Sequence, residues 1–295
     1  LAQTAGPRLR MAELMLGSPL ALISDLSRAH FVVVFGGQQP DGDWGPWTLG
    51  GSHEQQIQHS RRTKGTKVSV VGPRKTDFAE KMDQFIGIRP GTEPFMLLGM
   101  LVAVVKGGWG DQQYIDDYTS GYAELQEILE PWTVEACAEV CGVQSAQISG
   151  LALKFSRAAM GVVHADYGTF SNAHSGLGVW AWMALHTVTA NTLRPGGLYH
   201  HRGVVDLQPV FEKLPTDGAP RTRVLDTPLL LMQGPDAALA DEILVPGEGR
   251  VRGLICVDAD PVDSIPDSAR TREALASLDL LVCLARQPSE TTAHA

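Results

Sequence analysis

The residues best suited to chemistry lie in two short loops between positions 72 and 93. The first loop reads Gly-Pro-Arg-Lys-Thr and contains Arg74, whose guanidinium is a fixed fork of donors that matches a phosphate. The second reads Arg-Pro-Gly-Thr-Glu and ends in Glu93, whose carboxylate offers two acceptors in one plane. Two such loops near each other are typical of a nucleotide-binding crevice. The alternative is a pair of surface turns with solvated side chains.

The elements around these loops predict how they are positioned. Residues 30–36 and 67–71 are apolar runs that predict buried strands, and residues 54–64 between them have a helical pattern. Apolar runs separated by a helix-length spacer predict a β-α-β unit with a right-handed crossover. Pro73 has no N–H to donate to a sheet, so the second strand must end there. Its loop then lies at the carboxyl edge of the sheet.

Further patterns extend this organisation along the chain. Helices are expected over 94–106, 130–141, 145–159 and 174–191, and a strand over 161–165. Thr133 is the expected N-cap and Gly142 the expected stop of the second of these helices. Residues 199–248 are rich in Pro and Gly and predict a linker with loops. Residues 253–257, 266–276 and 278–284 then predict a second strand–helix–strand unit with parallel strands.

The fold class that follows is α/β, with two Rossmann-like lobes whose parallel sheets are flanked by helices. We expect a nucleotide-binding lobe over residues 1–203 and the incomplete start of a second lobe over 204–295. In such sheets the ligand contacts come from the loops just past the carboxyl ends of the strands. In the first lobe these loops contain Gly36, Gly72, Pro90 and Tyr167.

Four segments, taken together, carry a resemblance to a known family. Residues 68–76 resemble a strand ending in Asp-Pro-Arg-x-Thr in the molybdopterin-guanine-dinucleotide oxidoreductases, the DMSO reductase family, which includes formate dehydrogenases and nitrate reductases. Residues 88–93 are similar to that family's Ile-Arg-Pro-Gly-Thr-Asp loop. Arg-Pro-Gly-Gly at 194–197 and Ser-Glu-Thr-Thr-Ala at 289–293 follow in the expected order. The resemblance runs from about Asp25 to the end of the chain.

This resemblance implies cofactor contacts at particular residues. The backbone is expected to approach the dinucleotide in the loops of Gly36, Gly72, Gly91, Gly168 and Thr169. Side-chain contacts are expected from Gln38 and Arg74, and Glu93 is expected to recognise guanine. In the second lobe, contacts are expected at Asp258 and Asp260. The alternatives are a plain turn for the loop of Gly36 and an exposed loop acid for Glu93. No catalytic residue and no metal ligand is assigned within this chain.

The chain also departs from the family pattern. Gln38 stands where Asn is usual, Glu93 where Asp is usual, and Gly72 where an Asp is expected to hold the ribose hydroxyls. In the second lobe Asp-Ala-Asp-Pro at 258–261 replaces Gly-x-Asn-Pro, and Ala285 replaces an Asp. Negative charge beside a pyrophosphate weakens binding unless a cation intervenes. The second lobe is therefore expected to bind its half of the cofactor weakly or differently.

The function implied is that of part of a catalytic subunit that binds bis(molybdopterin guanine dinucleotide) with molybdenum or tungsten for two-electron redox chemistry. The iron–sulfur segment, the metal ligand and a terminal pterin domain are expected outside this chain, so the isolated chain should be inactive. The parent enzyme would act on a small molecule and pass electrons to a partner subunit or domain. Alternatives are a cofactor-free relative, such as the large iron–sulfur subunit of NADH-quinone oxidoreductase, or a nucleotide-binding scaffold module.

Composition supports a globular chain and narrows its partners. Apolar residues make up 44% and charged residues 19% of the chain, and the net charge of −9 argues against nucleic acid. No apolar run approaches the roughly 20 residues that cross a bilayer. The chain begins with Leu1 and shows no signal pattern, so we expect a cytoplasmic location unless a signal segment lies upstream.

Cysteine and histidine residues add no metal site at this stage. Cys137, Cys141, Cys256 and Cys283 form no CxxC pair and are expected to be core residues. His174 could face an active-site funnel or sit solvated at a helix start. His200 and His201 could steer an anion or lie in a solvated turn.

Overall fold

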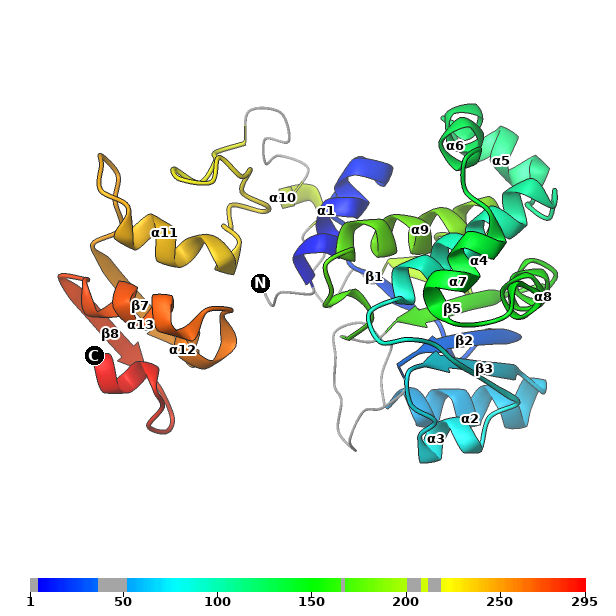
Figure 1. Ribbon diagram of the computed structural model, residues 1–295, viewed down its shortest axis with the longest axis horizontal. Coiled ribbons are helices and arrows are strands. Elements are labelled where there is room, and N and C mark those ends of the chain that lie inside the picture. Colours follow the sequence, from blue (N-terminus) through cyan, green and yellow to red (C-terminus); the bar gives the residue numbers. More distant parts are fainter. Residues whose placement is uncertain (1–4, 37–51, 166–167, 201–207, 212–218) are drawn as a thin grey trace. The chain divides into compact units, whose positions relative to one another are not determined.

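The computed structural model describes residues 5–36, 52–165, 168–200, 208–211 and 219–295, which form two compact units. The first unit is Pro7–Val205, and the second is Leu1–Gly6 with Asp206–Ala295. Each unit is described by itself (Figure 1). That residues 1–203 and 204–295 act as separate functional lobes stays a prediction.

The first unit contains a four-stranded parallel sheet in the order β4-β3-β2-β5. Its strands are β2 (Phe31–Phe35), β3 (Lys67–Gly72), β4 (Gln84–Gly87) and β5 (Gly161–Ala165). β2, β3 and β5 match the strands expected from the sequence, and the α/β class is confirmed. Their apolar runs are continuous because a parallel strand covered on both faces is buried throughout. A short antiparallel pair, β1 (Leu22–Ser24) with β6 (Leu198–His200), lies beside them.

Helices cover both faces of this sheet. α2 (His53–Lys64) lies on one side, and α4 (Glu93–Lys106), α7 (Val134–Cys141) and α8 (Ser145–Ser156) lie on the other (Figure 1). α4 is buried from Met96 to Val105, which explains why its sequence is apolar all round. The remaining helices of the unit are α1 (Ala5–Leu16), α3 (Asp77–Glu80), α5 (Gln112–Tyr118), α6 (Tyr122–Leu129) and α9 (Ser175–Val188).

Local capping sets the helix ends that face the loops. The Thr133 hydroxyl accepts from the backbone N–H of Ala136, and Gly142 ends α7 in the left-handed conformation, as expected from the sequence. Ser52 and Gln55 form a capping box at the start of α2. The start of α2 is therefore fixed at His53.

Side chains of α9 form hydrogen bonds with the backbone of β5 at the strand edge that faces away from β2. The N–H of Val163 donates to His186 Nε2 at 2.9 Å, and its carbonyl accepts from Trp182 Nε1 at 2.7 Å. His186 Nδ1 lies 2.7 Å from the carbonyl oxygen of Trp182, so Nδ1 carries the proton and Nε2 is the acceptor. Complete burial lowers the pKa of His186 to about 4.

The second unit is built around two parallel strands, β7 (Gly253–Val257) and β8 (Leu280–Leu284). α12 (Pro261–Ser264) and α13 (Ser268–Ala276) connect them, and the predicted parallel pairing is confirmed. The expectation of loops alone over 199–248 is wrong, because α11 (Leu239–Leu244) packs on α13 through Ile243 and Ala274. A helix of six residues shows too few periods to be recognised from sequence. α10 (Gln208–Phe211) is also short.

The cysteines behave as core residues. Cys137, Cys141 and Cys256 are buried, and burial raises the pKa of each thiol to about 11. Within the described ranges no group of three His, Cys, Asp or Glu side chains could hold a metal ion. Nor is any helix in those ranges long and apolar enough to span a membrane.

Candidate nucleotide-binding crevice

The carboxyl edge of the four-stranded sheet gathers the loops that the sequence selects. The N–H of Gly36, just past β2, donates to the carbonyl of Val71 at 3.0 Å, and the N–H of Ile88 donates to that of Gly72 at 3.1 Å. β3 and β4 lie on one side of β2, and β5 lies on the other. The strand order therefore reverses between β2 and β5, which is where open α/β sheets bind ligands.

Gly36 and Gly72 lie against each other at this edge. Gly36 has φ 87°, a conformation that favours glycine. A Cβ on Gly72 would lie 3.6 Å from the Gly36 carbonyl oxygen, an ordinary contact, and φ of Gly72 is not positive. The backbone there would accept the Asp that the family carries. Gln38 lies outside the described residues.

Arg74 is an exposed cation at this edge, as is the adjacent Lys75. Arg74 is exposed on the loop after β3, and it makes no hydrogen bond or ion pair within the described ranges. A guanidinium held at a strand tip and not engaged by its own fold can bind a phosphate. Its exposure is equally compatible with a solvated side chain.

The loop before α4 is anchored to the end of α7. The N–H of Arg89 donates to the Cys141 carbonyl at 2.9 Å, and its Nη1 donates to the Glu139 carbonyl at 2.8 Å. Gly91 has φ 78°, and nothing lies within 4 Å of where its Cβ would be. The loop is thus held at its base and open at Gly91.

Glu93 is the first residue of α4 and is 9% exposed, so the alternative of an exposed loop acid is wrong. A carboxylate in the first turn is stabilised by the helix dipole. Burial is the main cause of the raised pKa of Cys141, and the nearby Glu93 carboxylate adds to it. A guanine edge that reaches Glu93 would have to enter the base of α4.

Gly168 and Thr169 form a short 3-10 turn after β5 that extends to Phe170. Thr169 is buried, and its carbonyl accepts from Asn172 Nδ2 at 3.0 Å. The Phe170 ring meets the Trp182 ring edge-on at 5.9 Å between centroids. This turn is packed on α9 and presents backbone close to the switch point.

A buried basic cluster at the end of β5 was not predicted from the sequence. Arg8 Nη2 donates to the Ala165 carbonyl at 2.6 Å, and the His53 and His164 rings lie 4.1 Å apart between centroids. His164 Nδ1 lies 3.0 Å from Ser24 Oγ. His164 is 2% exposed, and its Nε2 has no hydrogen-bond partner within the described ranges. One polar residue inside the apolar strand 161–165 is the sequence signal that could have found it.

Electrostatics make this cluster receptive to negative charge. Burial, then His53 and Arg8, hold the pKa of His164 well below its usual range. Its imidazole is therefore neutral at pH 7, and an anion nearby would favour its protonation. The amino terminus of α2, which begins at His53, adds backbone donors of the kind that bind phosphate.

The second unit uses its corresponding loops differently. Asp258 has φ 49°, and its carboxylate binds Arg286 with both oxygens, at 2.6 and 3.1 Å. Asp260 accepts from the Thr291 hydroxyl and, at 3.2 Å, from the Thr291 N–H. The hydrogen bond from the Thr291 hydroxyl is the main cause of the lowered pKa of Asp260. The two aspartates expected to repel a phosphate are thus engaged within the unit.

Of the histidines named from the sequence, His174 and His200 lie on different elements. His174 is exposed at the start of α9 with its ring 5.1 Å from that of Phe95 between centroids. His200 is the last residue of β6, and its buried ring nitrogens have no hydrogen-bond partner among the residues that the structure describes. His201 lies outside the described residues.

Comparison with known proteins identifies relatives. No family model matches the chain. It is 24% identical over 234 residues to the probable oxidoreductase YoaE of Bacillus subtilis, covering 77% of this chain and 32% of the relative. It is 27% identical over 231 residues to the F420-dependent formate dehydrogenase subunit alpha of Methanocaldococcus jannaschii, covering 75% and 34%. Acetylene hydratase of Syntrophotalea acetylenica is 28% identical over 93 residues, covering 32% and 13%.

This chain is related to the DMSO reductase family of molybdopterin oxidoreductases. The solved acetylene hydratase from Pelobacter acetylenicus aligns with 99% of the chain and 43% of its own, with a TM-score of 0.78 and 14% identity, which confirms the fold. The chain spans about a third of the length of the two oxidoreductases that it matches over most of its sequence. The resemblance expected from the four segments is therefore confirmed.

Proposed function

We propose that this chain is the dinucleotide-binding part of a molybdenum or tungsten bis(molybdopterin guanine dinucleotide) oxidoreductase of the formate dehydrogenase type. One observation carries the proposal: a buried basic cluster lies where the strand order of the parallel sheet reverses. The names of the relatives support it, since three are alpha subunits of F420-dependent formate dehydrogenases and others are putative formate dehydrogenases. Partner subunits and a small-molecule substrate are part of the same proposal.

The residues of the first unit fit such a group. Among the residues that the structure describes, the buried His164 Nε2 has no hydrogen-bond partner, and the exposed Arg74 makes no hydrogen bond or ion pair. Arg8, His53 and the start of α2 would hold phosphate charge, while Gly36, Gly72, Gly168 and Thr169 would bring backbone close. Glu93 would read guanine through the open loop of Gly91. The bound cofactor would supply the two-electron chemistry, and the chain would position it.

For the second unit we propose a weaker or altered contact with the other half of the cofactor. Asp258 faces Arg286, so a phosphate approaching this loop would have to compete with a carboxylate already in place. Asp260 is held by Thr291 and cannot turn outward without losing both hydrogen bonds. We also propose a cytoplasmic location, as for a chain without a membrane helix in its described part.

The second candidate is a cofactor-free relative that keeps the fold. The observation that favours it is the same pair of engaged aspartates, together with Gly72 in place of the ribose-binding Asp. A scaffold of this kind would keep the sheet and lose the ligand. The His164 ring argues against it, because its Nε2 is buried without a hydrogen-bond partner in the described part of the chain, and an unsatisfied buried polar atom costs stability unless a ligand meets it.

The experiment that separates these candidates uses the full-length parent protein. Metal content is measured by mass spectrometry and pterin by fluorescence after oxidation, in protein produced with molybdate or with tungstate. Molybdenum or tungsten with pterin is the expected result. Protein that carries neither metal nor pterin under both conditions would establish the structural role instead.

A further inference from the structure

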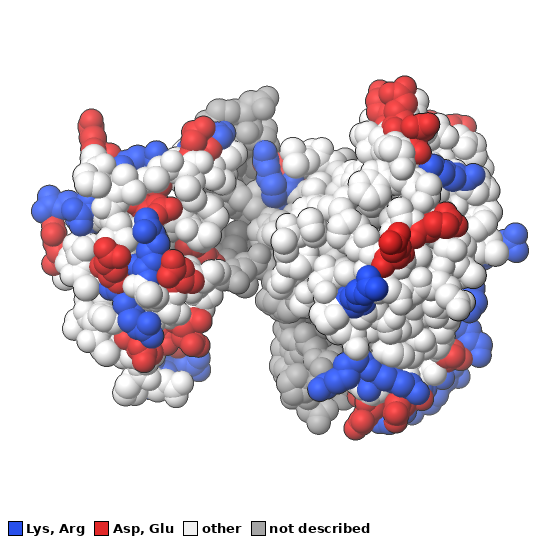
Figure 2. Space-filling model, in the orientation of Figure 1, with Lys and Arg blue, Asp and Glu red and all other residues white. Residues whose placement is uncertain are grey.

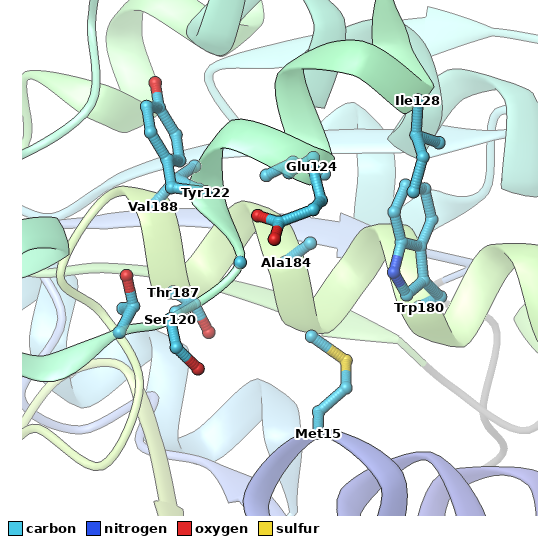
Figure 3. Close-up of a pocket in the computed structure, with 12 residues that line it drawn as sticks. Met15, Ser120, Tyr122, Glu124, Ile128, Trp180, Ala184, Thr187 and Val188 are labelled. Atoms are coloured by element: carbon cyan, nitrogen blue, oxygen red, sulfur yellow. The ribbon is translucent and has the colours of Figure 1, made fainter.

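A hollow on the first unit lies away from the sheet edge and is formed by α1, α6 and α9. Its volume is about 210 Å³, and its apolar walls include Met15, Leu125, Trp180 and Val188. In Figure 3 the Glu124 carboxylate extends into the space between Thr187 and Trp180, with Met15 opposite. The hollow therefore offers one exposed carboxylate beside apolar and aromatic walls.

Glu124 has no partner of its own. It lies in the first turn of α6, yet it makes no hydrogen bond or ion pair within the described ranges. The side chains that line the hollow with Glu124 include no Lys or Arg within the described residues. The carboxylate is left to pair with a cation from outside the unit.

The surface around the hollow is strongly acidic. Residues 107–133 contain six acidic side chains and no Lys, Arg or His. None of the six forms an ion pair in the described part of the chain. They are Asp111, Asp116, Asp117, Glu124, Glu127 and Glu130. Figure 2 shows red side chains gathered where α5 and α6 lie. Such a field attracts a basic partner and repels nucleic acid and anionic membranes.

Large apolar side chains are exposed on the same elements. Leu14 on α1 is 63% exposed, Tyr118 at the end of α5 is 74% exposed, and Ile128 on α6 is 58% exposed. Tyr118 also lines a second hollow with Arg194 and Tyr114. Aromatic and aliphatic side chains that ring a pocket are the usual core of a protein interface, with charges at the rim.

We propose that this face docks a basic polypeptide segment, with one Lys or Arg entering the hollow to pair with Glu124 beside Trp180. Apolar neighbours of that residue would cover Ile128 and Tyr118, and further basic residues would face Asp116, Asp117 and Glu127. The stem of a Lys or Arg is apolar and its tip is charged, which matches a hollow with apolar walls and one carboxylate. A cation beside an indole face adds attraction.

The test measures binding of defined peptides to the 295-residue chain by fluorescence anisotropy. The probe is a synthetic amphipathic helix of Leu and Lys; its Leu and Glu counterpart is the control peptide. The basic peptide should bind with an affinity that falls as salt rises, and the acidic peptide should not bind. Glu124→Gln should weaken binding roughly three- to fivefold, as for an exposed ion pair worth up to about 1 kcal/mol.

Glu135→Gln is the matched control, because Glu135 is also an exposed acid in the first turn of a helix of this unit. It should leave binding unchanged, and thermal melting should show that both variants are folded. Glu127→Gln provides a second acidic change if Glu124→Gln lowers stability. Equal binding by wild type, both α6 variants and Glu135→Gln would overturn the proposal. The proposal would also be overturned if n-butylamine displaced the peptide at the concentration at which the peptide saturates the chain. The hollow would then be a site for small cations.

Discussion

The two parallel sheets of this chain end in loops of opposite character. At the carboxyl edge of the first sheet, Arg74 makes no hydrogen bond or ion pair with the described residues, and Arg8, His53 and His164 are brought together. At the carboxyl edge of β7 and β8, Asp258 is bound by Arg286, and Asp260 is bound by Thr291. One edge keeps groups that can meet an anion, and the other satisfies its charged groups internally.

This difference shows that a shared strand-and-crossover plan does not decide what a loop binds. In the second unit the segment 289–293 carries the hydroxyl and N–H that hold Asp260. The family-like segment there has a structural role that the sequence resemblance did not reveal. Ligand binding has to be argued from the groups that remain available at each edge.

The largest expected effect separates binding from catalysis. The isolated 295-residue chain should show no oxidoreductase turnover with formate and a dye acceptor, because no metal ligand is assigned in it and catalysis needs the metal in a closed site. A spectrophotometric assay of the purified chain tests this. Any turnover above that of buffer with dye would contradict it.

Glu93→Gln tests whether the first edge reads guanine. In the full-length parent at limiting cofactor, guanine-dinucleotide content should fall about ten- to a hundredfold, because an amide donor would face a guanine donor and a charge-assisted hydrogen bond is lost. Since Glu93 is buried at the start of α4, thermal stability must be measured on the same samples. Glu80→Gln, on an exposed position of α3, is the control and should change neither quantity. Equal cofactor content in the wild type and both variants would show that Glu93 does not recognise guanine.

Acid should destabilise the two units at different pH. His186 is neutral in the folded protein with a pKa of about 4, while in the unfolded chain it binds a proton below about pH 6.5. The first unit should therefore lose about 3 kcal/mol of unfolding free energy between pH 6.5 and 4. His164 adds to this loss in the same direction. The pKa of Asp260 in the folded protein is lower than its usual value of 3.8. The ionised carboxylate therefore stabilises the second unit above about pH 3.8, and this stabilisation is lost as the pH falls below that value.

Intrinsic fluorescence can separate these two transitions. All six tryptophans lie between positions 44 and 182, and the sequence after position 206 contains neither Trp nor Tyr. Urea unfolding at pH 7.5 and at pH 4.5, followed by tryptophan emission, reports the first unit, and circular dichroism reports both. An unchanged urea midpoint by tryptophan emission would show that His186 titrates normally.

Gly72→Asp is expected to have the smallest effect and would make the first edge more like the family. A Cβ fits at this position, so the variant should fold with a melting temperature within a few degrees of wild type. The added carboxylate should strengthen binding of GDP to the chain a few-fold through ribose hydroxyls, as measured by calorimetry. Weaker binding of GDP by the variant would show that the ribose does not lie beside position 72.

The sequence predicted the buried strands well and the shorter elements poorly. β2 is a continuous apolar run and β5 is one except for His164, because these two parallel strands are covered on both faces. β7 was recognised from its apolar residues although Ile255 and Val257 are exposed. β4 is a four-residue edge strand with Gln84 at its start, and it has too few apolar residues to be recognised. The basic cluster joins positions 8, 53 and 164, a proximity that follows from topology and cannot be read from spacing.

The engagement of β5 by α9 has a consequence for solubility. An uncovered strand edge is a template on which another chain can add a strand. Here the N–H and carbonyl of Val163 are occupied by His186 and Trp182, so this edge does not offer itself for self-assembly at neutral pH. A protonated His186 would carry a proton on Nε2 as well, so this nitrogen could no longer accept the hydrogen bond from the Val163 N–H. The strand edge would then lose its contact with α9. Acidification would then expose a strand edge with unpaired backbone groups. Aggregation of the chain should begin near the pH at which His186 takes up its proton.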